Sequence, residues 1–213
     1  MQRKQLMSNP EGRLLAGLVG LKLDPALAEP LLRYLGELVL WNKAYNLTAV
    51  RDPVEMVTRH LLDSLTVLPH VSGRVADIGT GAGLPGLPLA IANPALHVTL
   101  LDSGGKKTRF LRHVQRVMAL PNVEVVEARA EAWTSAQPFD FVVSRAFGPL
   151  EDFLLNSAKF MGPHGRWLAM KGKLDAKELA SLPAGYVLEE TMALQVPGLH
   201  EDRHLLKIRR AQT

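Results

Sequence analysis

The sequence lacks cysteine, long apolar runs and any apolar segment behind its basic N-terminal residues. Without cysteine there can be no disulfide and no thiolate metal site, and the composition fits a reducing compartment. No segment approaches the roughly 18 consecutive apolar residues that a membrane-spanning helix needs, and the N-terminus does not resemble a signal peptide. We therefore expect a soluble, cytoplasmic protein with no membrane partner.

The rest of the composition is that of a globular protein with a sizeable core. The chain has 213 residues, of which 47% are hydrophobic and 22% are charged. This is enough for one large domain, or for one domain with a small appendage. The formal net charge of +4 is compatible with a polyanionic partner. Many basic proteins bind no nucleic acid, so charge alone does not decide the function.

The chain divides into two parts, residues 1–70 and residues 71–213. The first part reads as a helical extension, because apolar side chains recur at helical spacing. These side chains are Leu31, Leu32, Leu35, Leu38 and Val39. A further helix is predicted to begin at Asp52, a suitable N-cap that is followed by proline, and to run to about residue 68. The second part should form the main domain.

In residues 71–213, short β-rich runs alternate with helical stretches. The apolar runs show little polar alternation, which is typical of strands covered on both faces in a parallel, doubly wound α/β sheet. The last two runs are separated by only six residues, too few for a helical crossover, so they should pair antiparallel. The predicted strands are 74–79, 97–102, 123–128, 139–146, 165–172, 187–196 and 203–210.

A glycine-rich turn follows the first predicted strand, in V-A-D-I-G-T-G-A-G-L-P-G-L-P-L-A (75–90). It lacks the lysine of a nucleoside triphosphate loop, and its spacing is G-x-G-x-G rather than the G-x-G-x-x-G of dinucleotide folds. Asp77 stands two positions before Gly79 and would repel a pyrophosphate. A carboxylate there suits S-adenosylmethionine, which carries an ammonium and a sulfonium but no phosphate. The alternative is that the glycines only make a tight turn between strand and helix.

Asp102 supports a nucleoside cofactor. It ends the second predicted strand, 23 residues after Gly79. An acid at this place accepts hydrogen bonds from the two ribose hydroxyls of NAD or of S-adenosylmethionine. The spacing therefore indicates the fold and a nucleoside, while the turn chemistry favours S-adenosylmethionine. An NAD-dependent oxidoreductase remains the less favoured alternative.

Several long motifs resemble the RsmG family, formerly called glucose-inhibited division protein B. They are W-N-K-A-Y-N-L-T-A-V-R-D-P (41–53), R-H-L-L-D-S (59–64), D-I-G-T-G-A-G-L-P-G (77–86), L-L-D-S-G-G-K-K-T-R-F-L (100–111), F-D-F-V-V-S-R-A (139–146) and L-Q-V-P (194–197). The resemblance spans nearly the whole chain. It implies a class I S-adenosylmethionine-dependent methyltransferase fold, Rossmann-like, with seven strands of which the last is antiparallel. It also implies methyl transfer to N7 of one guanine in 16S ribosomal RNA of the small subunit.

The resemblance also implies cofactor-binding residues. They fall beyond the carboxyl ends of strands, where open α/β sheets bind ligands. Family members often carry a larger residue than Gly104. Arg145 has an alternative, a structural ion pair with a neighbouring acid, because a buried arginine is costly unless it is paired. The predicted cofactor residues are Asp77, Gly79, Gly81, Leu84, Asp102, Ser103, Gly104, Ala130, Glu131 and Arg145.

A basic helix is predicted after Asp102, and its cations are candidates for RNA contact. Arginines spaced by three and four share one helical face, although such faces are often merely solvated. Trp41 and Tyr45 either stack on RNA bases or pack the helical extension onto the sheet, and packing is favoured for Trp41. His60 and Asp63 either bond locally or line the substrate cleft. The predicted RNA-binding residues are Lys106, Lys107, Arg109, Arg112 and Lys171.

The reaction itself constrains what else to expect. Guanine N7 has a lone pair and no proton to lose, so no catalytic acid or base is predicted. No metal site is predicted, since no suitable ligand cluster is present. We expect a monomer. Two further alternatives are a ribosome-assembly factor that binds the cofactor without turnover, and a methyltransferase with a small-molecule or protein substrate.

Overall fold

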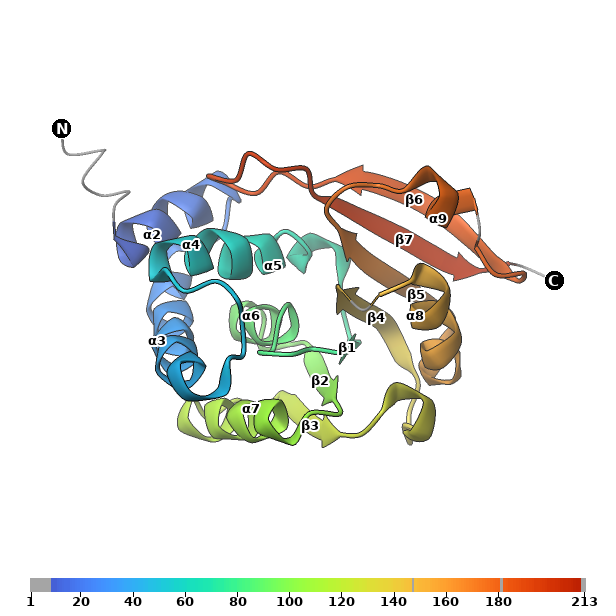
Figure 1. The fold of residues 1–213 in the computed structure, drawn as a ribbon, viewed down its shortest axis with the longest axis horizontal. Helices are drawn as coiled ribbons and strands as arrows, with labels where there is room; N and C mark the ends of the chain where they lie inside the picture. The colour runs from blue at the N-terminus through green and yellow to red at the C-terminus, as the bar shows by residue number, and fades with distance from the viewer. Residues whose placement is uncertain (1–8, 147, 181, 212–213) are drawn as a thin grey trace.

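The computed structural model describes residues 9–146, 148–180 and 182–211. Seven strands form one sheet in the order β3-β2-β1-β4-β5-β7-β6 (Figure 1). The first five strands run parallel, and β7 runs antiparallel to both β5 and β6. The strands are β1 (Arg74–Ile78), β2 (His97–Asp102), β3 (Val123–Glu127), β4 (Phe139–Arg145), β5 (Met161–Lys171), β6 (Tyr186–Ala193) and β7 (His204–Arg210). The predicted doubly wound sheet with its antiparallel end is confirmed.

Helices cover both faces of this sheet. Four of them connect strands: α6 (Gly86–Ala92), α7 (Gly105–Val117), α8 (Leu150–Ser157) and α9 (Ala176–Ala180). Short 3₁₀ turns lie at η4 (Ala130–Ala132) and η5 (Ala158–Phe160). The central strands carry buried apolar side chains on both sides, as the runs without alternation predict.

Most of the described residues between 9 and 70 are helical, as expected. The segments are α2 (Pro10–Gly20), η1 (Pro25–Leu27), α3 (Ala28–Tyr45), α4 (Pro53–Met56), η2 (Val57–Leu62), α5 (Asp63–Leu65) and η3 (Leu68–His70). Figure 1 shows α2, α3, α4 and α5 grouped on the side of the sheet that also holds α6 and α7. Their buried leucines and Tyr34 belong to one hydrophobic core with Leu100 and Phe110. A second core, around Trp167, lies between the opposite face and α8.

The helix predicted from Asp52 begins where expected but is not a uniform α-helix. The Asp52 carboxylate accepts a hydrogen bond of 3.0 Å from the Val54 amide, and proline occupies the first turn. The middle of the helix, Val57–Leu62, is wound as a π-helix, and the α-helical part ends at Leu65. Apolar periodicity does not distinguish the two windings over so short a segment. Such π turns are frequent at functional sites.

Trp41 lies in α3 rather than in a link, because α3 continues through Tyr45. The helix ends at Asn46, which adopts the left-handed conformation with φ of 51° that asparagine tolerates at a helix end. The Trp41 ring lies 5.6 Å from the ring of Phe110 and 4.9 Å from that of His113. Both residues belong to α7, so Trp41 packs the helical extension onto α7, whereas the favoured interpretation predicted packing onto the sheet itself.

Among the helices in the described ranges, none combines the length and the apolar character that crossing a membrane would require.

Candidate cofactor and substrate site

The glycine turn between β1 and α6 needs its glycines for conformation and for space. Gly79, Gly81 and Gly83 have φ of 67°, 61° and 93°, a region that side chains rarely adopt. A Cβ on Gly86 would lie 2.3 Å from Leu100 Cδ2 and 2.9 Å from Asp77 Oδ2. The first three glycines therefore shape the turn, and Gly86 lets α6 pack closely against the sheet.

Asp77 is fully buried beneath this turn. Its Oδ2 accepts hydrogen bonds of 2.6 Å from the Thr80 hydroxyl and 2.8 Å from the Gly86 amide. Its Oδ1 is buried and accepts no hydrogen bond from any described residue. Burial raises the pKa of Asp77 to about 6. The sequence suggested a carboxylate beside a cation, and the contacts made by Asp77 in the structure tie together the two ends of the turn.

Asp102 links the turn to the loop after β2. Its Oδ1 accepts a hydrogen bond of 2.8 Å from the Gly104 amide. Its Oδ2 accepts hydrogen bonds of 3.0 Å from the Gly81 amide and 3.3 Å from Lys107 Nζ. The side chain is 6% exposed, and this exposed part faces a cavity. Two backbone amides thus fix a carboxylate at the end of β2, where the ribose of a nucleoside is expected.

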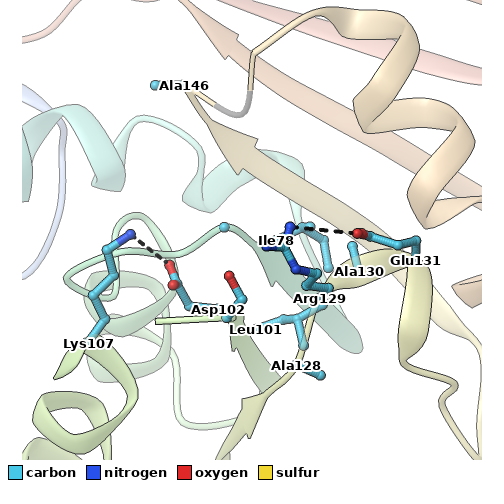
Figure 2. Close-up of a pocket in the computed structure, with 11 residues that line it drawn as sticks. Ile78, Leu101, Asp102, Lys107, Ala128, Arg129, Ala130, Glu131 and Ala146 are labelled. Atoms are coloured by element: carbon cyan, nitrogen blue, oxygen red, sulfur yellow. Dashed lines mark hydrogen bonds and ion pairs between the residues drawn. The ribbon is translucent and has the colours of Figure 1, made fainter. Parts of the chain in front are cut away.

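The first cavity, of about 320 Å³, lies at the carboxyl ends of β1 and β2 and in the segment after β3 (Figure 2). Figure 2 shows Lys107 reaching across to Asp102. The lining residues are Ile78, Gly79, Leu101, Asp102, Ser103, Lys107, Ala128, Arg129, Ala130, Glu131 and Ala146. Half of the predicted cofactor residues line it, namely Gly79, Asp102, Ser103, Ala130 and Glu131. Lys107, predicted for RNA contact, lines it too.

The other predicted cofactor residues do not line this cavity. Asp77, Gly81 and Leu84 form the turn behind it, and Leu84 is buried. Gly104 donates to Asp102 from the loop after β2. Arg145 ends β4 and faces a different cavity.

The first cavity fits S-adenosylmethionine. Its volume falls within the range of small-molecule sites, about 300–1,000 Å³. Asp102 offers carboxylate oxygens that can accept hydrogen bonds from ribose hydroxyls, and Ala130 is a small, buried residue of the lining. Gly79 leaves the backbone accessible at the end of β1. The lining places two carboxylates, those of Asp102 and Glu131, beside two cations, and the carboxylates can accept hydrogen bonds from the hydroxyls of a nucleoside.

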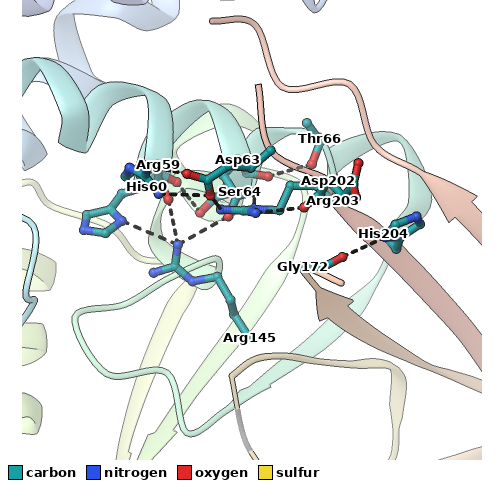
Figure 3. Close-up of polar contacts among 11 residues, drawn as sticks. Arg59, His60, Asp63, Ser64, Thr66, Arg145, Gly172, Asp202, Arg203 and His204 are labelled. Carbon is teal, nitrogen blue, oxygen red and sulfur yellow. Dashed lines mark hydrogen bonds and ion pairs between the residues drawn. The ribbon is translucent and has the colours of Figure 1, made fainter. Parts of the chain in front are cut away.

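A second cavity, of about 400 Å³, adjoins the first through Ala146, which lines both. It brings together segments that are far apart in the sequence (Figure 3). Its lining residues are Val50, Arg59, His60, Asp63, Arg145, Ala146, Met170, Lys171, Gly172, Leu194, Arg203 and His204. The mixture of four apolar side chains with several cations suits a flat, polar ligand such as a nucleobase.

Arg145 is fixed in the second cavity by three neighbours from the η2–α5 helix. One terminal nitrogen of Arg145 donates a hydrogen bond of 2.9 Å to the Arg59 carbonyl oxygen and one of 3.4 Å to Asp63 Oδ2. The same nitrogen lies 3.5 Å from His60 Nδ1. Arg203 Nε lies 3.3 Å from Asp63 Oδ1. Burial raises the pKa of Asp63, although both arginines oppose this. The ion pair weighed as an alternative for Arg145 is present, and sequence reasoning did not find Arg203.

His60 is buried and makes a polar contact at each ring nitrogen. Nε2 lies 2.8 Å from the Thr48 hydroxyl, and Nδ1 faces Arg145. Burial, together with the positive charge of Arg145, lowers the pKa of His60 to about 4. The imidazole is therefore neutral near neutral pH. His60 and Asp63 both make local polar contacts, as the first interpretation of this pair expects, and both line the second cavity.

The cations predicted for RNA contact lie at the surface near these cavities. Lys106, Arg109 and Arg112 are exposed on α7, and Arg112 pairs with Glu127 at 3.1 Å. Lys107 pairs with Asp102. Lys171 lines the second cavity and pairs with Glu178 at 2.7 Å.

Solved structures share the fold of this chain. TrmN from Thermus thermophilus is 19% identical, with a TM-score of 0.56, over 80% of this chain and 53% of that chain. A SAM-dependent methyltransferase from Thiobacillus denitrificans, solved in complex with S-adenosyl-L-homocysteine, is 13% identical, with a TM-score of 0.53, over 70% of this chain and 90% of that chain. At these identities the likeness supports the class I methyltransferase fold alone.

Sequence similarity identifies the family of the chain as well as its fold. Residues 27–206 match the family GidB, described as rRNA small subunit methyltransferase G. A ribosomal RNA small subunit methyltransferase G of Xanthomonas axonopodis is 52% identical over 91% of this chain and 92% of that protein. One from Xanthomonas campestris is 53% identical, over 90% and 91%. The chain therefore belongs to the rRNA small subunit methyltransferase G family, and it is an S-adenosylmethionine-dependent methyltransferase of small-subunit ribosomal RNA.

Proposed function

We propose that this chain transfers the methyl group of S-adenosylmethionine to N7 of one guanine in 16S ribosomal RNA, with the cofactor in the first cavity and the guanine in the second. The observation that carries this assignment is that the two cavities meet at Ala146, at the end of β4. A methyl donor and an acceptor base held in them would face each other across one residue.

The cofactor would be held mainly by the ends of β1 and β2. Asp102 would accept hydrogen bonds from the ribose hydroxyls, with Ser103 and Gly104 beside it. Ala130 and Glu131 would border the adenine. When bound, the cofactor supplies an electrophilic methyl group on a sulfonium.

The residues of the second cavity would position the base and exclude water. Guanine N7 attacks with its lone pair, so no side chain has to remove a proton. His60 fits this account, because its lowered pKa leaves it neutral and its ring nitrogens contact Thr48 and Arg145. Holding the two reacting atoms in line at about 3 Å can supply much of the rate enhancement. The base would leave its local stack to enter the cavity.

RNA would approach over the surface that carries the predicted cations. Lys106, Arg109 and Arg112 on α7 would contact phosphates, and Lys171 would lie beside the base. Phosphate contacts of this kind make affinity fall steeply with salt. We propose further that the enzyme acts as a monomer in the cytoplasm, where its ribosomal RNA substrate is found, and that its substrate is presented within the small subunit.

Methyl transfer from labelled S-adenosylmethionine tests this proposal. Small subunits and naked 16S RNA are taken from cells that lack the gene, and the labelled base is mapped. Label at N7 of one guanine supports the proposal, and the preferred substrate indicates when in assembly the enzyme acts. Tight cofactor binding with no label on either substrate would contradict the proposal and favour an assembly factor without turnover.

A further inference from the structure

Two arginines that line the second cavity share one exposed carboxylate. Arg59 contacts Glu201 through both terminal nitrogens, at 2.5 and 3.2 Å, in the forked arrangement that arginine makes with carboxylates and phosphates. Arg203 contacts the same carboxylate at 3.2 Å. Arg59 lies on η2, and the other two residues lie in the loop between β6 and β7. Glu201 itself does not line the cavity.

The carboxylates of Asp63 and Glu201 differ in how easily another anion can displace them from the arginines. The Asp63 side chain is 3% exposed and holds Arg145 and Arg203 from inside. The Glu201 side chain is 48% exposed, against 36% for Arg59 and 19% for Arg203. An incoming anion could displace Glu201 into water at small cost, whereas Asp63 has no such route.

The charges of the cluster are almost balanced only while Glu201 stays in place. Through direct contacts among the described residues, Arg59, Arg145 and Arg203 face two carboxylates, those of Asp63 and Glu201. His60 adds no charge near neutral pH, because its pKa is lowered. If Glu201 swings away, three guanidinium groups face one carboxylate. The position it vacates then strongly favours another anion.

We propose that Arg59 and Arg203 bind the backbone phosphate next to the target guanosine, and that Glu201 occupies this phosphate position until RNA displaces it. This inference rests on the proposed function, because a guanine in the second cavity would leave its sugar and phosphate at the entrance. A phosphate offers the two arginines the same pair of oxygens as the carboxylate does. Glu201 would then act as a built-in competitor that weakens binding of other polyanions.

The competing explanation is that the ion pair merely fastens the β6–β7 loop to η2. Exposed ion pairs of this kind contribute little to stability, about 0–1 kcal/mol. The two explanations predict opposite changes in RNA affinity when Glu201 is removed. If the pair is only a fastener, removal of either partner has the same effect on RNA binding. If Glu201 is a competitor, removal of Arg59 weakens RNA binding and removal of Glu201 strengthens it.

The experiment compares Arg59→Gln and Glu201→Gln in the full chain, with small subunits or 16S RNA as ligand. Arg166→Gln and Glu189→Gln are the matched controls. Arg166 forks onto Glu189 at 2.7 and 3.3 Å, with side chains 26% and 31% exposed, and neither residue lines the second cavity. Dissociation constants are measured over a range of salt concentrations. The Kd for S-adenosylhomocysteine and the melting temperature are recorded for every variant.

For Arg59→Gln we expect the Kd for RNA to rise about tenfold, and the slope of log K against log salt to become shallower by about 0.7–0.9, as for one lost phosphate contact. For Glu201→Gln we expect the Kd for RNA to fall about threefold, with a steeper slope. The control variants and the Kd for S-adenosylhomocysteine should stay within about twofold.

Weaker RNA binding by both Arg59→Gln and Glu201→Gln, with matching losses of melting temperature, would overturn the inference. The ion pair would then only hold the β6–β7 loop to η2. Unchanged RNA binding by Glu201→Gln would also overturn it. Failure of the wild-type enzyme to label N7 of guanine would refute the proposed function instead, and the transfer assay detects this separately.

Discussion

The two adjoining cavities are built in opposite ways. In the first, the backbone amides of Gly81 and Gly104 fix the key carboxylate, Asp102, and small residues share the lining with longer side chains. The second is made of long side chains that fix one another, with Asp63 between Arg145 and Arg203. The first depends on residues that are close in the sequence. The second depends on contacts between η2, the end of β4 and the β6–β7 loop.

This difference assigns different tasks to the two cavities. A rigid site with backbone donors suits a cofactor that is the same in every turnover. A site of mutually paired side chains can exchange an internal partner for an RNA group, as proposed for Glu201. Variants of Asp102 in the first cavity should therefore alter cofactor binding and leave RNA binding nearly unchanged, and variants in the second should alter RNA binding or transfer.

The largest effect is expected for Asp102→Ala. The variant loses the acceptors for two ribose hydroxyls, each a charge-assisted hydrogen bond worth about 1.5–3 kcal/mol. The Kd for S-adenosylhomocysteine should rise by about 150-fold or more, and Asp102→Asn should lose less affinity. Calorimetric titration measures the Kd, and RNA binding at fixed salt should change less than about twofold. A change in cofactor affinity of less than about fivefold would contradict the role of Asp102.

The next effect concerns Asp77 and the pH dependence of folding. Burial raises the pKa of Asp77 from 3.8 to about 6, so the protonated form favours the folded state. The stability contributed by Asp77 is complete below about pH 4 and is lost as the pH rises through about 6. Asp77→Asn cannot ionise and keeps an acceptor for Thr80 and Gly86. As the pH rises from about 4 to above 6, the unfolding free energy of Asp77→Asn should therefore increase by about 3 kcal/mol relative to that of wild type.

Denaturation of both proteins at several pH values checks this expectation. His60 contributes with the opposite sign, because its folded-state pKa is lowered to about 4, but it is present in both proteins and cancels in the difference. If the difference in unfolding free energy between the two proteins stays constant with pH, the pKa of Asp77 is not raised by folding.

A smaller effect is expected for Trp41→Ala, which tests the support beneath the first cavity. The half-buried ring packs α3 against Phe110 and His113 of α7. Its loss should cost about 2 kcal/mol of unfolding free energy, less than for a fully buried tryptophan, and Trp41→Phe should cost less still. Urea denaturation measures this. A loss of RNA affinity in a folded Trp41→Phe variant would instead favour stacking on RNA.

The smallest effect is expected for the pH dependence of transfer. Because His60 is neutral above about pH 4 and guanine N7 carries no proton, kcat should change less than about twofold between about pH 6 and 8. Single-turnover rates at saturating substrates measure this. A rise in kcat that follows a group titrating near 6.5 in both wild type and Asp77→Asn, which lacks the carboxyl that titrates at about 6, would identify a general base, and the positioning account would then fail.

The sequence allowed the first cavity to be predicted better than the second. The glycine turn and Asp102 lie 23 residues apart, counted from Gly79, and each follows a strand whose register places it at the same edge. Arg59 and Arg203 are 144 residues apart by position, and only the fold brings Arg59 to Glu201, which is two residues from Arg203. The π-helical winding of Val57–Leu62, a segment that contains His60 and precedes Asp63, also leaves no mark on the apolar pattern.

The central claim is that the target guanine enters the second cavity. It is tested most directly with substrate RNA that carries 6-thioguanosine at the methylated position, irradiated in complex with the enzyme and S-adenosylhomocysteine. The account predicts cross-links to peptides that contain Met170 or Leu194, both of which line that cavity. Cross-links confined to α7, around Lys106 and Arg109, would contradict it.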